Sequence, residues 1–180
     1  SELQPKAVFH YFEELCAIPR GSGNTKAVSD WCAAFAKARG LEYHQDALNN
    51  IIIIKEAAPG YKGAEPVILQ GHLDMVCAVR PGSGWNPLAD PVTVMEEGGF
   101  LRSDGRASLG ADNHLGNAAA LWLLSTGAVN HGPLRLLFTT AEEVGLEGAK
   151  EVAPDWLARA EYLLNTDGFH LGRAVLGSAS

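Results

Sequence analysis

The second half of the sequence alternates short apolar runs with segments of helical spacing, and this alternation restricts the folds open to the chain. The runs 66–72, 133–143 and 160–168 are typical of buried strands, and the segments 109–127 and 146–153 between them are typical of helices. Strands that alternate with helices favour a largely parallel sheet covered by helices. We therefore predict a three-layer α/β sandwich with a mostly parallel central sheet.

The first half adds further elements to this plan. Its apolar spacing predicts two helices, two strands and a hairpin, in the order 5–20, 24–40, 41–46, 49–56 and 92–103. The hairpin turn is expected around Glu97-Gly98-Gly99. Trp85, in a long Gly- and Pro-rich loop, is interpreted as a core or loop anchor, and 173–180 as a final strand. No repeat or interdomain linker interrupts the pattern.

Composition narrows the class of protein. The chain of 180 residues is 47% hydrophobic, enough for a sizeable core, and its formal charge of −7 with no basic run argues against binding to nucleic acid or anionic membranes. Its first residues lack the basic start and apolar stretch of a signal peptide. Cys16, Cys32 and Cys77 lack metal-ligand spacing and are interpreted as reduced, mostly buried thiols. These features favour a cytoplasmic protein.

Polar side chains follow the predicted strands of the second half. Side chains two residues apart on a strand point the same way, so His72 and Asp74 are expected side by side. Because sites in α/β sheets form outside the carboxyl ends of the strands, the polar residues there should converge at one edge. These residues are His72, Asp74, Asp112, Glu142, Glu143 and Asp167.

Taken singly, each of these residues has a simpler interpretation, such as a helix N-cap for Asp112 or a solvated strand end for Glu142 and Glu143. Taken together, converging carboxylates repel one another unless a cation lies between them, and burying them unpaired is costly. Imidazole and carboxylate groups are ordinary zinc ligands, and a bridging carboxylate fits a two-metal hydrolytic site with metals about 3.5–4 Å apart. One of the adjacent glutamates can bind metal while the other moves protons.

Four motifs, "HLDMV", "LGADN", "AEEVGLEGA" and "NTD", occur in the order and approximate spacing found in the aminoacylase/carboxypeptidase superfamily of zinc peptidases. The sequence most resembles the bacterial aminoacyl-histidine dipeptidases, also called peptidase D or Xaa-His dipeptidases, especially in "VILQGHLDMV" and "SLGADN". The resemblance covers the whole sequence.

This resemblance implies two zinc ions. His72 and Asp167 would bind the first zinc, Glu143 would bind the second, and Asp112 would bridge the two. Co²⁺ and Mn²⁺ are alternatives to Zn²⁺. The last ligand would be a histidine near the distant C-terminus of the longer family members.

The resemblance also implies the catalytic roles. Glu142 would be the general base for the attacking water, and Asp74 would orient the imidazole of His72 by a hydrogen bond. A cis peptide bond is expected between Asp112 and Asn113.

The sequence departs from the family pattern at two positions. His114 stands after "GADN" where a small residue is usual, and we interpret it as a partly exposed residue in the first turn of a helix rather than an extra metal contact. Ala141 stands where relatives often have threonine. The other histidines match no family ligand and are interpreted as surface or structural residues; they are His10, His44, His131 and His170.

Family members are far longer, because a lid-like domain interrupts their catalytic domain. Residues 1–180 therefore resemble the N-terminal part of the metallopeptidase catalytic domain, with the lid and the C-terminal half absent. An apolar edge left uncovered would favour self-association.

The implied function is hydrolysis of dipeptides of the Xaa-His type by a zinc metallopeptidase in its full-length form. Small peptides are the expected substrates, and a homodimer is compatible with the sequence. The alternatives are an N-acyl amino acid hydrolase or tripeptidase of the same superfamily, and a non-catalytic metal-binding or assembly module. Retention of Glu142 argues against the module, because binding metal alone does not require a general base.

Overall fold

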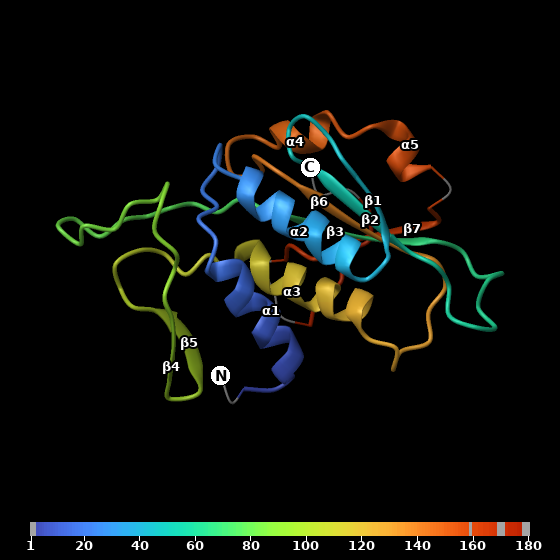
Figure 1. Cartoon of the computed structure of the whole chain (residues 1–180), viewed down its shortest axis with the longest axis horizontal. Helices are drawn as coiled ribbons and strands as arrows, with labels where there is room; N and C mark the ends of the chain where they lie inside the picture. Colours follow the sequence, from blue (N-terminus) through green and yellow to red (C-terminus); the bar gives the residue numbers. More distant parts are fainter. Residues whose placement is uncertain (1–2, 159, 169–171, 178–180) are drawn as a thin grey trace.

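The computed structural model describes residues 3–158, 160–168 and 172–177 (Figure 1). Among these residues the main sheet has five strands in the spatial order β1-β2-β6-β3-β7. In chain order they are β1 (Glu42–Gln45), β2 (Ile51–Lys55), β3 (Val67–His72), β6 (Leu134–Thr139) and β7 (Tyr162–Asn165).

The direction of the strands confirms the predicted α/β class. Strand β3 pairs in parallel with both β6 and β7. Strand β2 is antiparallel to β6, and β1 is antiparallel to β2. It follows that β1 runs the same way as β6, so four of the five described strands share one direction.

Helices cover both faces of this sheet, as Figure 1 shows. Three longer helices lie on one face: α1 (Lys6–Cys16), α2 (Lys26–Ala38) and α3 (Ala111–Ser125). Two short helices lie on the other: α4 (Glu147–Lys150) and α5 (Pro154–Leu157). The sequence pattern did not reveal α5, which has proline in its first turn, where the missing N–H costs no hydrogen bond.

The two faces have separate hydrophobic cores. Ile51 and Ile53 of β2 join the larger core with α1, α2 and α3, and Ile52 joins the smaller core with Val152 and Trp156 near α4 and α5. A strand that is buried on both faces is expected to be continuously apolar, which explains the run of four isoleucines. No described helix has the length and apolar character needed to cross a bilayer.

A separate hairpin, β4 (Val94–Glu97) and β5 (Phe100–Ser103), extends away from the main sheet (Figure 1). Its turn residues Gly98 and Gly99 have φ angles of 60° and 81°. A two-residue turn with positive φ at both positions is the type that matches the twist of paired strands, and glycine adopts it without strain. The predicted hairpin is therefore confirmed.

Other local predictions had mixed outcomes. The three cysteines are free, with Cys16 and Cys32 buried and Cys77 half-buried, and Trp85 is buried with its ring N–H donating to the carbonyl of Pro91. The strand expected over 173–180 is wrong for 173–177, which form no strand; residues 178–180 lie outside the described residues.

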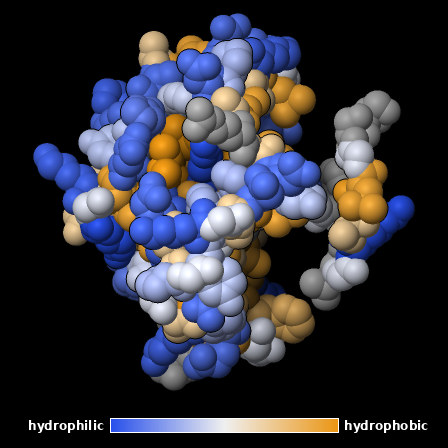
Figure 2. Space-filling model, turned by 90° about the vertical axis from the view of Figure 1, so that its right-hand side faces the viewer, coloured by the Kyte–Doolittle hydropathy of each residue, from blue (hydrophilic) through white to orange (hydrophobic). Residues whose placement is uncertain are grey.

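Figure 2 looks onto the side of the molecule that lies at the right of Figure 1, and it shows orange apolar side chains in and around a hollow in a largely blue surface. Strand β7 contributes large exposed apolar side chains: Tyr162, Leu163 and Leu164 are 60%, 50% and 55% exposed. This strand is also the last one of the described sheet, so one of its edges is unpaired.

Candidate metal centre

The register of the parallel strands brings the predicted site residues to one edge of the sheet. His72 is the last residue of β3 and is opposite Thr139, the last residue of β6. Gln70 is opposite Asn165 on β7, so Asp167 follows β7 at the level of His72. Glu142 and Glu143 follow β6 in a turn, and Asp112 lies at the start of α3.

His72 lies at the centre of the cluster. Its Nε2 atom is 3.2 Å from Asp112 Oδ1 and 3.7 Å from Asp167 Oδ2. The imidazole is only 2% exposed, whereas the side chains of Asp112 and Asp167 are 65% and 29% exposed. The histidine is therefore fixed in the protein interior, while the two carboxylates face solvent from which an ion can enter.

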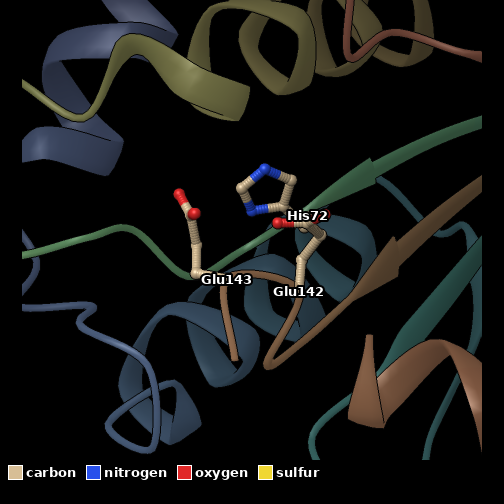
Figure 3. Close-up of side chains that lie close together, drawn as sticks. All are labelled: His72, Glu142 and Glu143. Carbon is tan, nitrogen blue, oxygen red and sulfur yellow. The ribbon is translucent and has the colours of Figure 1, made fainter. Parts of the chain in front are cut away.

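Two groups of side chains in the described part of the chain could hold a metal ion, and both contain His72. One is His72, Asp112 and Asp167, and the other is His72, Glu142 and Glu143; within each group the donor atoms lie within 4.8 Å of one another. Figure 3 shows the carboxylates of Glu142 and Glu143, from the turn after β6, directed toward the imidazole. Imidazole nitrogen and carboxylate oxygen suit a divalent ion such as zinc. The residues present therefore fit a metal.

Asp74 connects the histidine to the glutamate turn. His72 Nδ1 lies 3.0 Å from the backbone carbonyl of Asp74 and 3.5 Å from its Oδ1 atom. The Asp74 carboxylate accepts hydrogen bonds from the backbone N–H groups of Glu142, at 3.0 Å, and Glu143, at 3.4 Å. It also accepts one from the Ser22 hydroxyl at 2.7 Å. Asp74 is thus a buried anchor for both the imidazole and the glutamates.

The pKa shifts show how strongly the side chains of the cluster act on one another. Burial of the His72 ring disfavours its charged form, but hydrogen bonds to Asp74 and Asp112 and the charge of Glu142 outweigh burial and raise the pKa of His72 to about 9. Burial, then the charge of Asp112, raises the pKa of Asp167. Burial, then the charges of Glu142 and Asp112, raises the pKa of Glu143 against the opposing effect of His72. A bound cation would relieve this repulsion.

The interpretation of His114 as partly exposed is wrong. Its side chain is fully buried, and neither ring nitrogen makes a hydrogen bond of good geometry with the described residues, although backbone groups of Asp112 and Leu73 lie nearby. The residue lies in the interior near enough to Arg20 for its charge to act on the ring, and Arg20 is itself 1% exposed and donates to the carbonyls of Leu109 and Gly110. Burial, followed by the charges of Arg20 and His72, lowers the pKa of His114, so the ring is neutral.

The other histidines that the structure describes are not part of the cluster. His10 and His44 are exposed and His131 is half-buried, as expected, and His170 lies outside the described residues. The expected cis peptide bond between Asp112 and Asn113 is present.

Sequence reasoning missed several polar residues that support the cluster. Ser22 holds Asp74 from the loop between α1 and α2, and Asn117 donates to the carbonyl of His72 at 2.6 Å. Thr166 lies 3.0 Å from Asn113. No pattern in the sequence marks Ser22, because 52 residues separate it from Asp74.

A pocket of about 220 Å³ opens beside the cluster on the face of α4 and α5. Side chains of three neighbouring strands form a polar wall: Gln70 Oε1 accepts from Asn165 at 2.5 Å, and Gln70 Nε2 donates to Thr139 at 3.2 Å. The rest of the lining beyond the metal donors is apolar and consists of Leu137, Leu146, Ala149, Val152, Leu157 and Leu163. A substrate side chain could occupy this space next to the donor atoms.

An α/β sandwich with clustered histidine and carboxylates at its strand ends is an arrangement used for metal-dependent hydrolysis. In agreement, the sequence pattern of the peptidase family M20/M25/M40 matches residues 68–177, and the chain belongs to this family.

Two relatives show how far the similarity extends. The chain is 35% identical over 179 residues to the cytosol non-specific dipeptidase of Escherichia coli, a match that covers 99% of this chain and 36% of the relative. It superposes on the crystal structure of aminoacylhistidine dipeptidase from Vibrio alginolyticus with a TM-score of 0.89 and 33% identity, over 93% of this chain and 34% of that one. A Staphylococcus aureus tripeptidase, 24% identical with a TM-score of 0.74, shares the fold. The chain thus spans about a third of the length of the first two relatives.

Proposed function

We propose that residues 1–180 form the N-terminal part of the catalytic domain of a metal-dependent dipeptidase, with Zn²⁺ at two positions and Co²⁺ or Mn²⁺ as alternatives. Membership of the peptidase family supports the class of reaction. Dipeptides are the proposed substrates, including those with C-terminal histidine, because the two relatives of highest identity described above are named as dipeptidases and one as an aminoacylhistidine dipeptidase.

His72 and Asp167 would hold the first ion, Glu143 the second, and Asp112 both. The grouping of His72 with Asp112 and Asp167 supports the first assignment. For the second ion, one support is that Glu143 belongs to the other group of potential metal donors. A second support is that Asp112 lies near enough to Glu143 for its charge to raise the pKa of that carboxyl. A bound divalent ion would polarise the scissile carbonyl and make water easier to deprotonate.

Glu142 is the proposed general base. Its carboxylate would take a proton from the attacking water and deliver it to the nitrogen of the leaving amine as the peptide C–N bond breaks. The products are a carboxylic acid and an amine, so atoms and protons balance.

The observation that carries this proposal is the fixed position of Glu142. Its backbone N–H is bound to the buried carboxylate of Asp74, which lies beside His72, and its side chain is directed toward the imidazole (Figure 3). A general base must be held near the reacting atoms, whereas a glutamate that is only solvated in a turn needs no fixed position.

The test is Glu142→Gln in the protein at its natural length. Gln keeps the shape of the side chain but cannot accept a proton, so kcat for dipeptide hydrolysis should fall by about 100-fold or more while zinc content is retained. Glu56→Gln, at an exposed position after β2, is the matched control and should leave kcat unchanged.

The outcomes separate the alternatives. Equal activity of Glu142→Gln and the unaltered protein would reject Glu142 as the base. Zinc binding without turnover of dipeptides, tripeptides or N-acyl amino acids by the unaltered protein would instead support a metal-binding module. Preference for one of the other two substrates would identify the related hydrolase.

We further propose a cytoplasmic location, consistent with three free thiols and with the name of the Escherichia coli relative. A homodimer is the assembly to test alongside activity.

A further inference from the structure

Two side chains that directly adjoin proposed metal ligands contact each other. Thr166 precedes Asp167 at the end of β7, and Asn113 follows Asp112 at the start of α3. The Oγ1 atom of Thr166 lies 3.0 Å from Oδ1 of Asn113. This contact joins two segments that are 53 residues apart in the chain.

The same threonine is tied to the central strand β3. Its backbone N–H donates to the carbonyl of Gln70 at 2.9 Å, and its Oγ1 atom is 3.1 Å from that carbonyl. A hydroxyl has one proton and cannot donate to two oxygens at once. With the Asn113 amide turned about its last bond, its NH₂ donates to Thr166 while the hydroxyl donates to Gln70, so each of these two contacts has one donor and one acceptor. Both amide orientations leave a hydrogen bond available between Thr166 and Asn113.

Two glycines provide the space for this contact. A Cβ atom at Gly71 of β3 would overlap the side-chain oxygens of Asn113 and Asn117. A Cβ atom at Gly116 of α3 would lie 2.5 Å from Thr166 Oγ1 and 2.8 Å from Thr166 Cβ. The backbones of β3 and α3 approach closely because neither position carries a side chain, and the polar pair fills the space between them.

The pair connects the two segments that carry these carboxylates. Asp112 and Asp167 each approach His72 Nε2, at 3.2 and 3.7 Å, and carry like charges. Their mutual repulsion opposes a close spacing, and a wider spacing would remove one donor from the group. A hydrogen bond between the neighbouring residues opposes that separation.

We propose that Asn113 and Thr166 are positioning residues that set the spacing of the Asp112 and Asp167 carboxylates and thereby the affinity of this group for a divalent ion. The inference rests on the metal centre of the proposed function. Groups that orient metal ligands contribute about 10- to 100-fold to metal affinity in other proteins, which sets the size of the expected effect.

The test compares Thr166→Val, which removes the hydroxyl but keeps the branched shape, with Thr166→Ser, which keeps the hydroxyl. Zinc affinity is measured by titration against a competing chelator, and thermal unfolding is measured on the metal-free protein. Thr166→Val should weaken zinc binding about tenfold, and Thr166→Ser should restore affinity to within about threefold of the unaltered chain. Thr126→Val, at the opposite end of α3, is the matched control: it removes a hydroxyl that accepts a hydrogen bond from the backbone N–H of Ala128, away from the site, so zinc affinity should be unchanged.

If the role of Thr166 is purely structural, Thr166→Val should lower the unfolding temperature of the metal-free protein and leave the zinc affinity of the folded fraction unchanged. That result would overturn the inference. Zinc affinity of Thr166→Val equal to that of the unaltered chain would also overturn it. If Thr166→Val does not fold, Asn113→Ala decides, because it removes the other half of the same hydrogen bond. Absence of zinc binding by the unaltered chain would reject the proposed metal centre itself, and this inference with it.

Discussion

Asp74 is a carboxylate with no exposure to solvent, and it remains ionised because its partners satisfy it. Burial alone would raise its pKa, but hydrogen bonds from His72, Ser22 and the backbone of Glu142 outweigh burial and lower it. Its stabilising contribution is therefore present above the pKa of an unfolded aspartate, about 3.9, and is lost as the pH falls through the lower folded-state value. Removing one partner should have a measurable cost.

Ser22→Ala removes the 2.7 Å hydrogen bond to Asp74. Because the acceptor is a buried charge, we expect the free energy of unfolding at pH 7 to fall by about 1.5–3 kcal/mol, measured by urea denaturation. Ser125→Ala is the control: its hydroxyl donates to a carbonyl of its own helix at an exposed position, so the change should stay within about 0.5 kcal/mol. Equal effects of the two substitutions would show that Ser22 does not support Asp74.

Metal binding at His72 is coupled to the loss of a proton from its imidazole. With a pKa of about 9 in the metal-free protein, its imidazole is protonated at pH 7, whereas a metal ligand must be neutral. Zinc binding at pH 7 should therefore release about one proton, and affinity should rise as the pH increases toward 9. The folding stability of the metal-free chain changes with pH in the opposite direction to zinc affinity. The contribution of His72 to this stability is complete below about pH 6.5 and is lost as the pH rises through about 9.

Calorimetric zinc titrations in buffers of different ionisation enthalpy measure this proton directly. A slope near one proton is expected for the unaltered chain and for His44→Gln, a control at an exposed histidine paired with Glu42. A slope of zero would mean that His72 is already neutral before the metal arrives.

At the scale of elements, the approach of β3 to α3 depends on Gly71. A methyl group there would overlap the side chains of Asn113, which follows Asp112, and Asn117, which donates to the carbonyl of His72. We expect Gly71→Ala to destabilise the protein by about 1–3 kcal/mol, the usual cost of overpacking, as measured by chemical denaturation. Gly63→Ala, where a methyl group would meet none of the described atoms within 4 Å, should be close to neutral. A neutral Gly71→Ala would show that α3 can move away from β3 at little cost.

The elements also show which features sequence patterns can reveal. Strand β2 was predicted because burial on both faces requires a continuous apolar run, which its isoleucines provide. The β4–β5 turn was predicted because positive φ angles require glycine. His114 was misjudged because its burial depends on tertiary packing, whereas a polar residue in the first turn of a helix is normally solvated. The convergence of the donor side chains at one edge of the sheet was predicted because the carboxyl ends of parallel strands lie at the same edge. Its supporting contacts, such as Ser22 with Asp74, depend on tertiary structure alone.

For the whole molecule, the exposed strand β7 has the strongest physical consequence. It combines an unpaired sheet edge in the described structure with Leu163 and Leu164, which are 50% and 55% exposed. Open edges with apolar side chains favour pairing with a second sheet or chain. The 180-residue chain should therefore associate with itself as its concentration rises.

Sedimentation velocity over a range of concentrations tests this prediction. Leu164→Lys places a charge on β7, which proteins commonly use to block edge pairing, so it should shift the chain toward the monomer. Leu88→Lys is the control, because Leu88 is 71% exposed but lies in the loop before β4. If Leu88→Lys dissociates the chain as strongly as Leu164→Lys, the association depends on overall apolar exposure and not on β7. If the unaltered chain is monomeric at every concentration, the edge is protected by its own surroundings, and the exposed leucines do not drive assembly.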